Sequence, residues 1–441
     1  MSRLASGALV SIFWLCPCAS FAQASPSEGQ REASLFGTAR DADPSSTPIE
    51  NSLFGEQSQE QATDTLRSQN EALKETLTLG GQLFLTSQYT ISDNERPENA
   101  ALAAPLFLYL YLDGRPSDRV RVFARSRLDQ QLMSSPQPEL SSAEAQFFEQ
   151  GQSETRVSLD QLWLKFDVER HLFLTIGRQP IKWGAARLWN PTDFVNQDVR
   201  DPLAIFDARL GVPLLKLHAP FEAQGLNLYA LALLSDAGSP ADVGLALRAE
   251  LAIGRSELSA SFLAKRQRPT RIGADISAGI GPFEVRLETA VRRGGRAQTW
   301  RGPFSVENLN FPTRVDKRDA WWFQGVTSIE WGVAYGDQES LFITAEYFYN
   351  HEGYDDPNLY PWLFTQGEWR PLYVGKHYAG ANLALPRPGS FDNSSFVLSV
   401  LGNLSDNSYL TRFDYGVQVL TRLNINLFTA YHFGAEGEFN Y

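Results

Sequence analysis

From about Leu77 onward, apolar and polar residues alternate with a period of two over many stretches of the chain. The alternation is clean in Asp242–Ile253, Arg271–Ile280 and Phe283–Arg292. In each stretch Val, Leu, Ile, Phe and Ala fill one set of alternate positions, and the charged residues fall on the other set. Because successive side chains of a strand point to opposite faces, each stretch predicts a strand with one apolar face and one charged face.

Strands of this kind fit a soluble sandwich, or a barrel whose apolar face meets lipid. The many facing Arg and Glu residues on the polar faces favour a barrel with a wet interior. Aromatic residues near the predicted strand ends resemble the girdles of membrane barrels; they are Tyr109, Tyr111, Trp321, Trp322, Tyr347, Tyr349, Tyr415 and Tyr431. The pattern gives about 17 strands, and because bacterial barrels have even numbers we expect about 16–18. The predicted fold class is an all-β, transmembrane antiparallel β-barrel.

The connections between the predicted strands alternate between short and long, as in outer-membrane barrels. Short turns are expected at Asp113–Asp118, Glu169–His171, Gly254–Arg255, Gly281–Pro282 and Gly336–Gln338. Long segments are expected at Met133–Thr155, Gln179–Gly211, Gly294–Arg318 and Asn350–Pro371. The longest apolar run after the N-terminal region, Ala101–Leu112, has 12 residues and contains Pro105. A membrane helix needs about 20 apolar residues, so only a closed barrel remains as a way to span a bilayer.

The N-terminal region predicts export. Residues 1–24 have the cationic start (Arg3), the short apolar core (Leu9–Leu15) and the small residues before a cleavage site that define a secretory signal. Both cysteines, Cys16 and Cys18, lie in this signal, so the mature chain has no disulfide framework and no thiol nucleophile.

Three regions follow from these patterns: the signal at residues 1–24, a flexible periplasmic segment at 25–76, and an outer-membrane barrel at 77–441. The middle region is rich in Ser, Glu, Gln, Asp and Pro. Within it, Thr63–Leu77 fits a coiled-coil stub or, as we favour, a short helix of one or two amphipathic turns. The final stretch carries Tyr431, Phe433, Phe439 and Tyr441 at odd spacings, so we expect a last strand that ends in an aromatic and is recognised by the barrel assembly machinery.

The charge composition and the sequence motifs disfavour a nucleic-acid partner and an enzymatic function. The chain has 39 basic and 51 acidic residues, which disfavours a nucleic-acid partner. Its five histidines form no zinc-protease motif, and no Gly-x-Ser-x-Gly elbow is present. His377 would be the first candidate base of a hidden lipase-like pair, and Asp355 and Asp356 beside Glu352 could hold Ca²⁺, but a solvated acidic loop is favoured. We therefore predict no enzyme, no catalytic residue, no metal and no cofactor.

The stretch "GRQPIKWGAARLWNPTDF", Gly177–Phe194, carries three cations and two tryptophans. It ends the predicted strand His171–Ile176, where Gly177 marks an end or a bulge, and it opens the long segment Gln179–Gly211. Long structureless loops are uncommon unless functional. Asn190-Pro191 predicts a helix start and Asp201-Pro202 a stop, giving a short helix over Pro191–Arg200.

This segment alternates in charge, so we expect it to fold into the lumen as a constriction loop held to the wall by Arg–carboxylate pairs, with its tryptophans on the wall or the constriction. An outward, solvated loop is the alternative. The predicted pore-lining and constriction residues are Arg121, Arg125, Arg127, Lys165, Arg178, Lys182, Trp183, Arg187, Asp193, Asp198 and Lys216.

The segments "GRQPIKWG", "NPTDF" and "DPLAIFDARLGVPLLKL" resemble part of Gram-negative outer-membrane, porin-like barrels of the alginate-export and carbohydrate-channel kind. The resemblance is concentrated in residues 160–217. It implies that Arg178, Gln179, Trp183, Gly184 and Asp193 occupy the motif positions. No motif fixes the transported molecule.

Among positions assigned inward, cations slightly outnumber anions. The cations are Arg121, Arg125, Arg127, Lys165, Lys216, Arg248, Arg271, Arg286, Arg292 and Arg412; the anions are Asp129, Asp167, Glu250, Asp275, Glu284, Glu288, Glu346 and Asp414. Charged rings bias selectivity, so we expect a channel in the bacterial outer membrane for small polar, anionic or saccharide solutes. Loop aromatics (Tyr354, Tyr360, Trp362, Phe364, Trp369) would stack on sugars or, as we favour, pack on each other. The alternative function is a non-conducting structural or export-assembly barrel whose N-terminal segment binds a periplasmic partner. The remaining expected partners are outer-membrane lipids.

Overall fold

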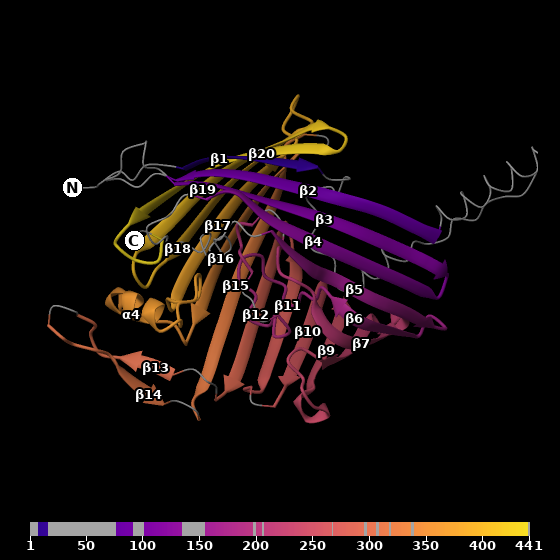
Figure 1. Cartoon of the computed structure of the whole chain (residues 1–441), viewed down its shortest axis with the longest axis horizontal. Coiled ribbons are helices and arrows are strands. Elements are labelled where there is room, and N and C mark those ends of the chain that lie inside the picture. Colours follow the sequence, from indigo (N-terminus) through magenta and orange to yellow (C-terminus); the bar gives the residue numbers. More distant parts are fainter. Residues whose placement is uncertain are drawn as a thin grey trace, which may run out of the picture.

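Strands dominate the chain (Figure 1). The computed structural model describes residues 8–15, 76–90, 101–134, 155–196, 200–204, 207–266, 268–294, 298–305, 308–316, 319–336 and 339–439. No helix within these ranges is long and apolar enough to cross a membrane. The predicted helix over Thr63–Leu77 falls outside the described residues except at its last two positions, where β2 already begins at Leu77.

One large sheet contains eighteen strands. They are β1 (Ala8–Leu15), β2 (Leu77–Thr90), β3 (Ala101–Ser117), β4 (Val120–Ser134), β5 (Arg156–Val168), β6 (Leu172–Gln179), β7 (Val212–Phe221), β8 (Leu226–Leu233), β9 (Gly244–Ile253), β10 (Ser256–Ala264), β11 (Arg271–Ile280), β12 (Phe283–Arg293), β15 (Trp321–Ala334), β16 (Ser340–Asn350), β17 (His377–Pro386), β18 (Ser394–Asn403), β19 (Ser408–Leu420) and β20 (Leu423–Gly434). The remaining elements are the hairpin β13 (Gln298–Arg301) and β14 (Thr313–Asp316), the 3₁₀ turns η2 (Glu222–Gln224), η3 (Pro240–Asp242) and η4 (Pro357–Leu359), and the helix α4 (Tyr360–Thr365).

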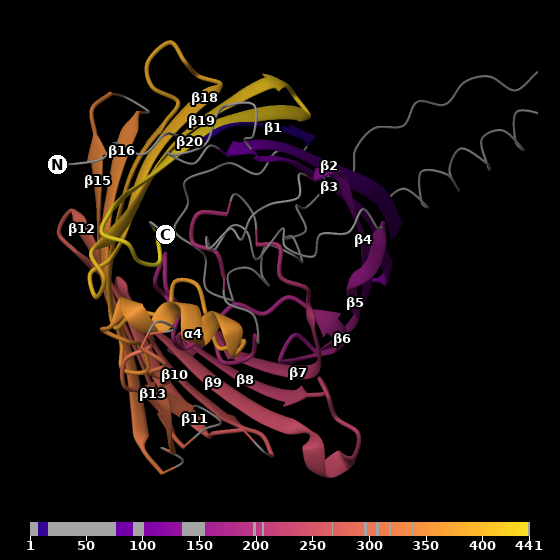
Figure 2. The same ribbon diagram turned by 60° about the vertical axis from the view of Figure 1, so that its left-hand side comes forward.

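Each strand of the large sheet is antiparallel to its neighbours, and β12 pairs directly with β15. Strand β1 pairs with both β2 and β20, which makes the sheet a ring (Figure 2). The structure thus has seventeen strands from β2 to β20 and an eighteenth from the apolar core of the expected secretory signal. Removal of residues 1–24 on export stays a prediction.

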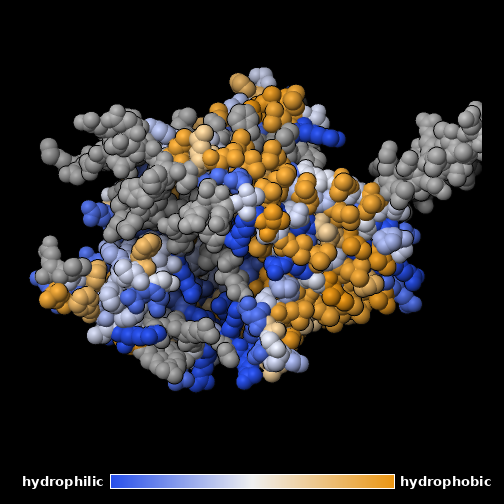
Figure 3. Space-filling view, in the orientation of Figure 1, coloured by the Kyte–Doolittle hydropathy of each residue, from blue (hydrophilic) through white to orange (hydrophobic). Residues whose placement is uncertain are grey.

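Burial along the strands is the reverse of that in a soluble protein. On β11 and β12, Ile272 and Leu287 are 55% and 44% exposed, whereas Arg286 and Glu288 are 3% and 0% exposed. Charged residues are costly to bury unless the interior supplies partners, and an exposed apolar band is stable only against lipid. Figure 3 shows apolar residues as a broad band over the outer face of β2 to β7. The predicted alternation of a lipid face and a wet face is confirmed.

The two rims of the ring differ. At one rim, which we call the short-turn rim, strands are joined by turns at residues 118–119, 169–171, 254–255, 281–282 and 421–422. The other, the long-loop rim, carries residues 180–211, the β13–β14 hairpin and the loop 351–376 with η4 and α4 (Figure 1). Short periplasmic turns and long external loops are the plan of outer-membrane barrels. Together with the reversed burial, they place the chain in the bacterial outer membrane.

The expectation that the last strand ends in an aromatic is wrong, and recognition by the assembly machinery stays a prediction. Strand β20 ends at Gly434, and residues 435–439 form bends. Phe439 is 5% exposed and packs among buried residues, so it does not continue the lipid-facing row of β20. Asp406 and Ser408 accept hydrogen bonds from the backbone N–H groups of this tail, and Asn403 donates one to the Glu438 carboxylate, so the tail turns away from the sheet. Tyr441 lies outside the described residues.

Candidate functional site at the constriction loop

The constriction loop, residues 180–211 between β6 and β7, crosses the inside of the ring (Figure 2). It reaches the opposite wall at Glu288 of β12. The Glu288 carboxylate accepts hydrogen bonds from the backbone N–H of Ala186 (3.2 Å) and of Thr192 (2.7 Å), and from the Thr192 hydroxyl (2.7 Å). Because three hydrogen bonds from the loop converge on one buried side chain, Glu288 is a firm anchor. The inward fold is therefore confirmed.

A second anchor lies two strands further along the wall. Glu346 of β16 accepts hydrogen bonds from the backbone N–H groups of Arg187 (3.0 Å), Leu188 (3.0 Å) and Trp189 (2.8 Å). The Arg187 side chain also meets Glu330 of β15, with Nη2 2.9 Å and Nε 3.1 Å from one carboxylate oxygen. Arg187–Glu330 is the predicted type of loop-to-wall contact, but backbone amides make most of the attachment.

Gly184 allows the loop to approach Glu288. Its φ is +97°, a conformation that side chains disfavour. A Cβ at this position would lie 2.7 Å from both carboxylate oxygens of Glu288. The glycine of the Trp-Gly pair in the sequence motif therefore has a structural reason: a residue with a side chain does not fit against Glu288 at this position. Gly177, in contrast, does not end its strand, because β6 continues to Gln179.

Both tryptophans of the loop are 1% exposed and lie in separate apolar clusters. Trp183 packs with Leu214 and Leu231 of the near wall, and the guanidinium of Arg248 lies 5.8 Å from its ring centroid. Trp189 stacks on Phe348 at 5.6 Å, and its Nε1 donates to the Leu372 carbonyl at 3.2 Å. They act as packing anchors at the two ends of the crossing.

The helix predicted over Pro191–Arg200 is wrong. Residues 191–196 and 200 form turns and irregular backbone. The N–H of Phe194 donates to the Thr192 carbonyl at 2.7 Å, a tight turn that a helix does not contain. Asp193 forms an ion pair with Arg209 at 2.8 Å. Burial works against the charged form of Arg209, but hydrogen bonds and the charges of Asp207 and Asp193 raise its pKa, so the guanidinium stays charged.

The predicted cations of β4 mostly form ion pairs with carboxylates of the same part of the wall. Arg121 of β4 pairs with Asp113 at 2.7 Å, Arg125 pairs with Asp160, and Arg127 pairs with Asp129 at 2.8 Å. The expectation that these arginines hold the loop is correct only for Arg127, whose Nη1 donates to the Ala208 carbonyl at 2.6 Å.

The remaining predicted residues are spread along the loop and wall. Lys165 is buried with its Nζ 4.6 Å from the Phe173 ring centroid, and Lys216 is buried on β7. Arg178 donates to the Gly211 carbonyl at 3.0 Å, which closes the base of the loop. Lys182 is half-buried. Asp198 lies outside the described residues.

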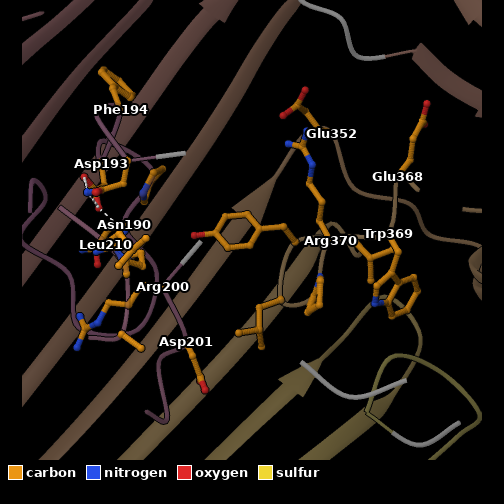
Figure 4. Close-up of a pocket in the computed structure, with 18 of the residues that line it drawn as sticks. Asn190, Asp193, Phe194, Arg200, Asp201, Leu210, Glu352, Glu368, Trp369 and Arg370 are labelled. Atoms are coloured by element: carbon orange, nitrogen blue, oxygen red, sulfur yellow. Dashed lines mark hydrogen bonds and ion pairs between the residues drawn. The ribbon is translucent and has the colours of Figure 1, made fainter. Parts of the chain in front are cut away.

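A cavity of about 1830 Å³ opens between the constriction loop and the long-loop rim (Figure 4). Asp193 and Arg200 lie on one side of it, and Glu352, Trp369 and Arg370 lie on the other. Of the predicted site residues, Arg127 and Asp193 line this cavity. Its cations are Arg127, Arg156, Arg200, Arg209, Lys265, Arg266, Arg268, Arg271, Arg292 and Arg370; its anions are Asp129, Asp193, Asp201, Asp236, Asp242, Glu352 and Glu368. The described lining thus has ten cations and seven anions, although the whole chain is acidic.

Among the described residues, four cations of this lining form no ion pair with a carboxylate. Arg200 and Lys265 donate to backbone carbonyls instead, whereas Arg271 of β11 and Arg370 of the loop 351–376 have neither a carboxylate nor a carbonyl partner. Arg292, the cross-strand partner of Arg271, is paired with Glu352. Arg271 also faces the Phe194 ring, with 5.9 Å from its Cζ to the centroid. The period-two pattern predicts Arg271 and Arg292 inside the barrel, but it gives no orientation for Arg370, because a loop has no such pattern.

The loop aromatics pack on each other, as favoured. Tyr360 and Leu363 are buried in a cluster with Trp300 of the β13–β14 hairpin, and Trp362 meets Trp300 edge-on at 5.3 Å. Only Tyr354 and Trp369 of the five also line the cavity.

No protein-family model and no curated protein matches the chain. Solved structures of low similarity do match it. OccK9 (OpdG) of Pseudomonas aeruginosa has a TM-score of 0.47 at 12% identity, covering 81% of this chain and 98% of its own. OccK5 (OpdH) of the same organism has 0.46 at 12%, with the same coverage. OmpF of Salmonella typhi, in complex with daunomycin, has 0.41 at 10%, covering 81% and 96%. These identities and TM-scores are too low to carry an argument. The assignment of the fold and of the location therefore rests on the strand pairing and the reversed burial.

Proposed function

We propose that this chain is a porin-like channel in which the constriction loop narrows the bore and small anionic solutes pass. The cationic lining of the cavity carries the proposal. Low-dielectric walls focus the field of an unbalanced lining, and rings of charge set the preference of a pore. Arg271 and Arg370 contribute most directly, because neighbouring carboxylates do not neutralise them.

An anionic solute fits the cavity better than a neutral saccharide does. Of the five loop aromatics, Tyr360 is buried and Trp362 packs edge-on against Trp300, and neither of them lines the cavity. Trp369 and Tyr354 still line the cavity, so a sugar acid, carried in the manner that the resemblance to alginate-export barrels implies, is the finer version of this proposal. We also propose that residues 1–24 direct export, that residues 25–76 lie on the periplasmic side, and that the barrel assembly machinery inserts the chain.

The test is the reversal potential of the purified protein in planar bilayers under a potassium chloride gradient. We expect a preference for chloride that falls in Arg271→Ala and further in the double variant with Arg370→Ala. Arg422→Ala removes the same charge from the turn 421–422 at the short-turn rim and serves as the matched control. A preference for potassium would refute the anionic version. Absence of current from folded, heat-modifiable protein would favour the non-conducting barrel.

A further inference from the structure

The segment after β20 turns toward the inside of the ring, next to the constriction loop (Figure 2). It consists of residues 435–439, and its last three residues are buried. We call it the tail. A chain that leaves a sheet normally runs into solvent, so a buried polar tail needs partners in the wall.

Glu438 supplies most of these contacts and is 2% exposed. One carboxylate oxygen accepts hydrogen bonds from the Tyr378 hydroxyl (2.6 Å) and from Asn403 Nδ2 (3.0 Å). The other accepts from the backbone N–H of Leu372. The N–H of Glu438 itself donates to Asp406 at 2.9 Å. The side chain therefore joins β17, β18 and the loop 351–376 at one point.

Phe439 extends the contact to the constriction loop. Its ring belongs to one buried cluster with Leu188 and Trp189 of that loop and with Leu372. Its N–H donates to Ser408 Oγ at 3.0 Å. Because Trp189 also donates to the Leu372 carbonyl, the tail packs at the junction of the two long loops.

The carboxyls in this junction have no neutralising cation. Asn403 Nδ2 is shared between Asp406 (2.8 Å) and Glu438 (3.0 Å), and neither carboxyl forms an ion pair within the described part of the chain. The other titratable groups that face it are Tyr360 of α4 and Tyr378 of β17, while His432 of β20 contacts the Phe439 carbonyl at 2.6 Å. Two adjacent carboxyls without a cation cannot both ionise cheaply.

We propose that the tail is a pH-sensitive lock: protonated Glu438 holds the constriction loop and the loop 351–376 together, and ionised Glu438 releases the tail. Burial, reinforced by the charge of Asp406, raises the pKa of Glu438 from 4.5 to about 8. The locked state therefore binds one more proton than the released state between these values. The ratio of the locked to the released state falls about tenfold per pH unit across that window and levels off above it.

The first test measures the attachment of the loop by hydrogen exchange of the Leu188 and Trp189 amides in detergent-folded protein, so it needs no current. Wild type and Glu438→Gln are compared at the same pH, at about pH 6 and about pH 9, which cancels the intrinsic pH dependence of exchange. We expect equal protection at the lower pH and faster exchange of the wild type at the higher pH. Glu436→Gln, an exposed carboxylate of the same tail, should behave as the wild type.

A chain that ends at Gly434 gives an independent variant if Glu438→Gln fails to fold. It should exchange fast at both pH values, with folding verified by heat-modifiability. Equal exchange of the wild type and Glu438→Gln at both pH values, or full protection in the shortened chain, overturns the lock.

The second test is conductance, and this part alone rests on the proposed channel. Single-channel current of the wild type should rise between about pH 6 and about pH 9, while Glu438→Gln stays flat. If no variant conducts, the proposed function fails, and the exchange experiment still decides the lock.

Discussion

The two halves of the barrel wall use their inward charges differently. On β4, Arg121, Arg125 and Arg127 each pair with a carboxylate of the same wall. On β12 and β16, Glu288 and Glu346 form no ion pair within the described residues and instead accept five backbone N–H groups of the constriction loop. A charge that is neutralised on its own wall rigidifies that wall. A charge that finds no partner on its own wall is available to hold a segment that crosses the lumen.

This difference in charge pairing also determines which side chains would present an unneutralised charge to a solute. The paired arginines of β4 present little net field, whereas Arg271 and Arg370 keep theirs. The backbone amides of the constriction loop bind the carboxylates of the far wall, Glu288 and Glu346. The cavity beside the loop has an excess of cations.

Removing both anchors should give the largest effect. In Glu288→Ala with Glu346→Ala, the loop amides lose their acceptors, and each orphaned donor costs about 1–3 kcal/mol. We expect the constriction loop to detach, the unfolding midpoint in urea to fall sharply, and the single-channel conductance to rise. Urea titration in detergent micelles and bilayer recording measure the two outcomes.

The matched control is Glu284→Ala, which removes an inward carboxylate of β12 that contacts Ser277 and Arg286 but not the loop. It should change conductance little. If it opens the pore as much as the double variant does, then general loss of wall charge, and not loop anchoring, sets the bore.

A smaller effect is expected from Gly184→Ala, which tests how closely the loop approaches its anchor. The new Cβ would meet a Glu288 carboxylate that cannot swing away without breaking its hydrogen bonds, and φ is +97°. We expect a loss of about 3 kcal/mol, against about 1 kcal/mol for Gly389→Ala. Gly389 also has positive φ, but nothing lies within 4 Å of a Cβ there. Equal losses in thermal unfolding would show that backbone strain alone matters.

Sequence patterns predicted the barrel correctly, because the alternation that marks each strand is contained in a few consecutive residues. The alternation that marks Arg271–Ile280 coincides with β11, and that of Phe283–Arg292 is one residue short of β12. A lipid face and a wet face repeat every two residues, so a short window contains the whole signal. The inward direction of the constriction loop could also be predicted, since its charges need a wet surface.

The mode of attachment could not be predicted, because it joins residues far apart in the chain. Glu288 lies about a hundred positions beyond Ala186, and the donors it holds are backbone groups that every residue type offers. The helix predicted over Pro191–Arg200 is replaced by tight turns, in one of which the N–H of Phe194 donates to the Thr192 carbonyl. The tail escaped prediction for a similar reason: Phe439 continues the spacing of β20 aromatics in sequence, but Asp406 and Ser408 draw the backbone inward.

Arg187 should give the smallest effect, and it distinguishes the two kinds of anchor within one residue. Its backbone N–H donates to Glu346, while its side chain, which is 30% exposed, pairs with Glu330. Arg187→Ala removes only the side-chain pair, and solvent screening limits the loss to about 1 kcal/mol. Glu330 keeps Arg286 at 3.3 Å, so it is not left alone. We expect a slight fall in the unfolding midpoint and unchanged conductance, with partial recovery in Arg187→Lys, which restores the charge but not the two-nitrogen contact. Should Arg187→Ala open the pore as widely as loss of both glutamates, side-chain pairing would hold the loop after all, as the sequence first suggested.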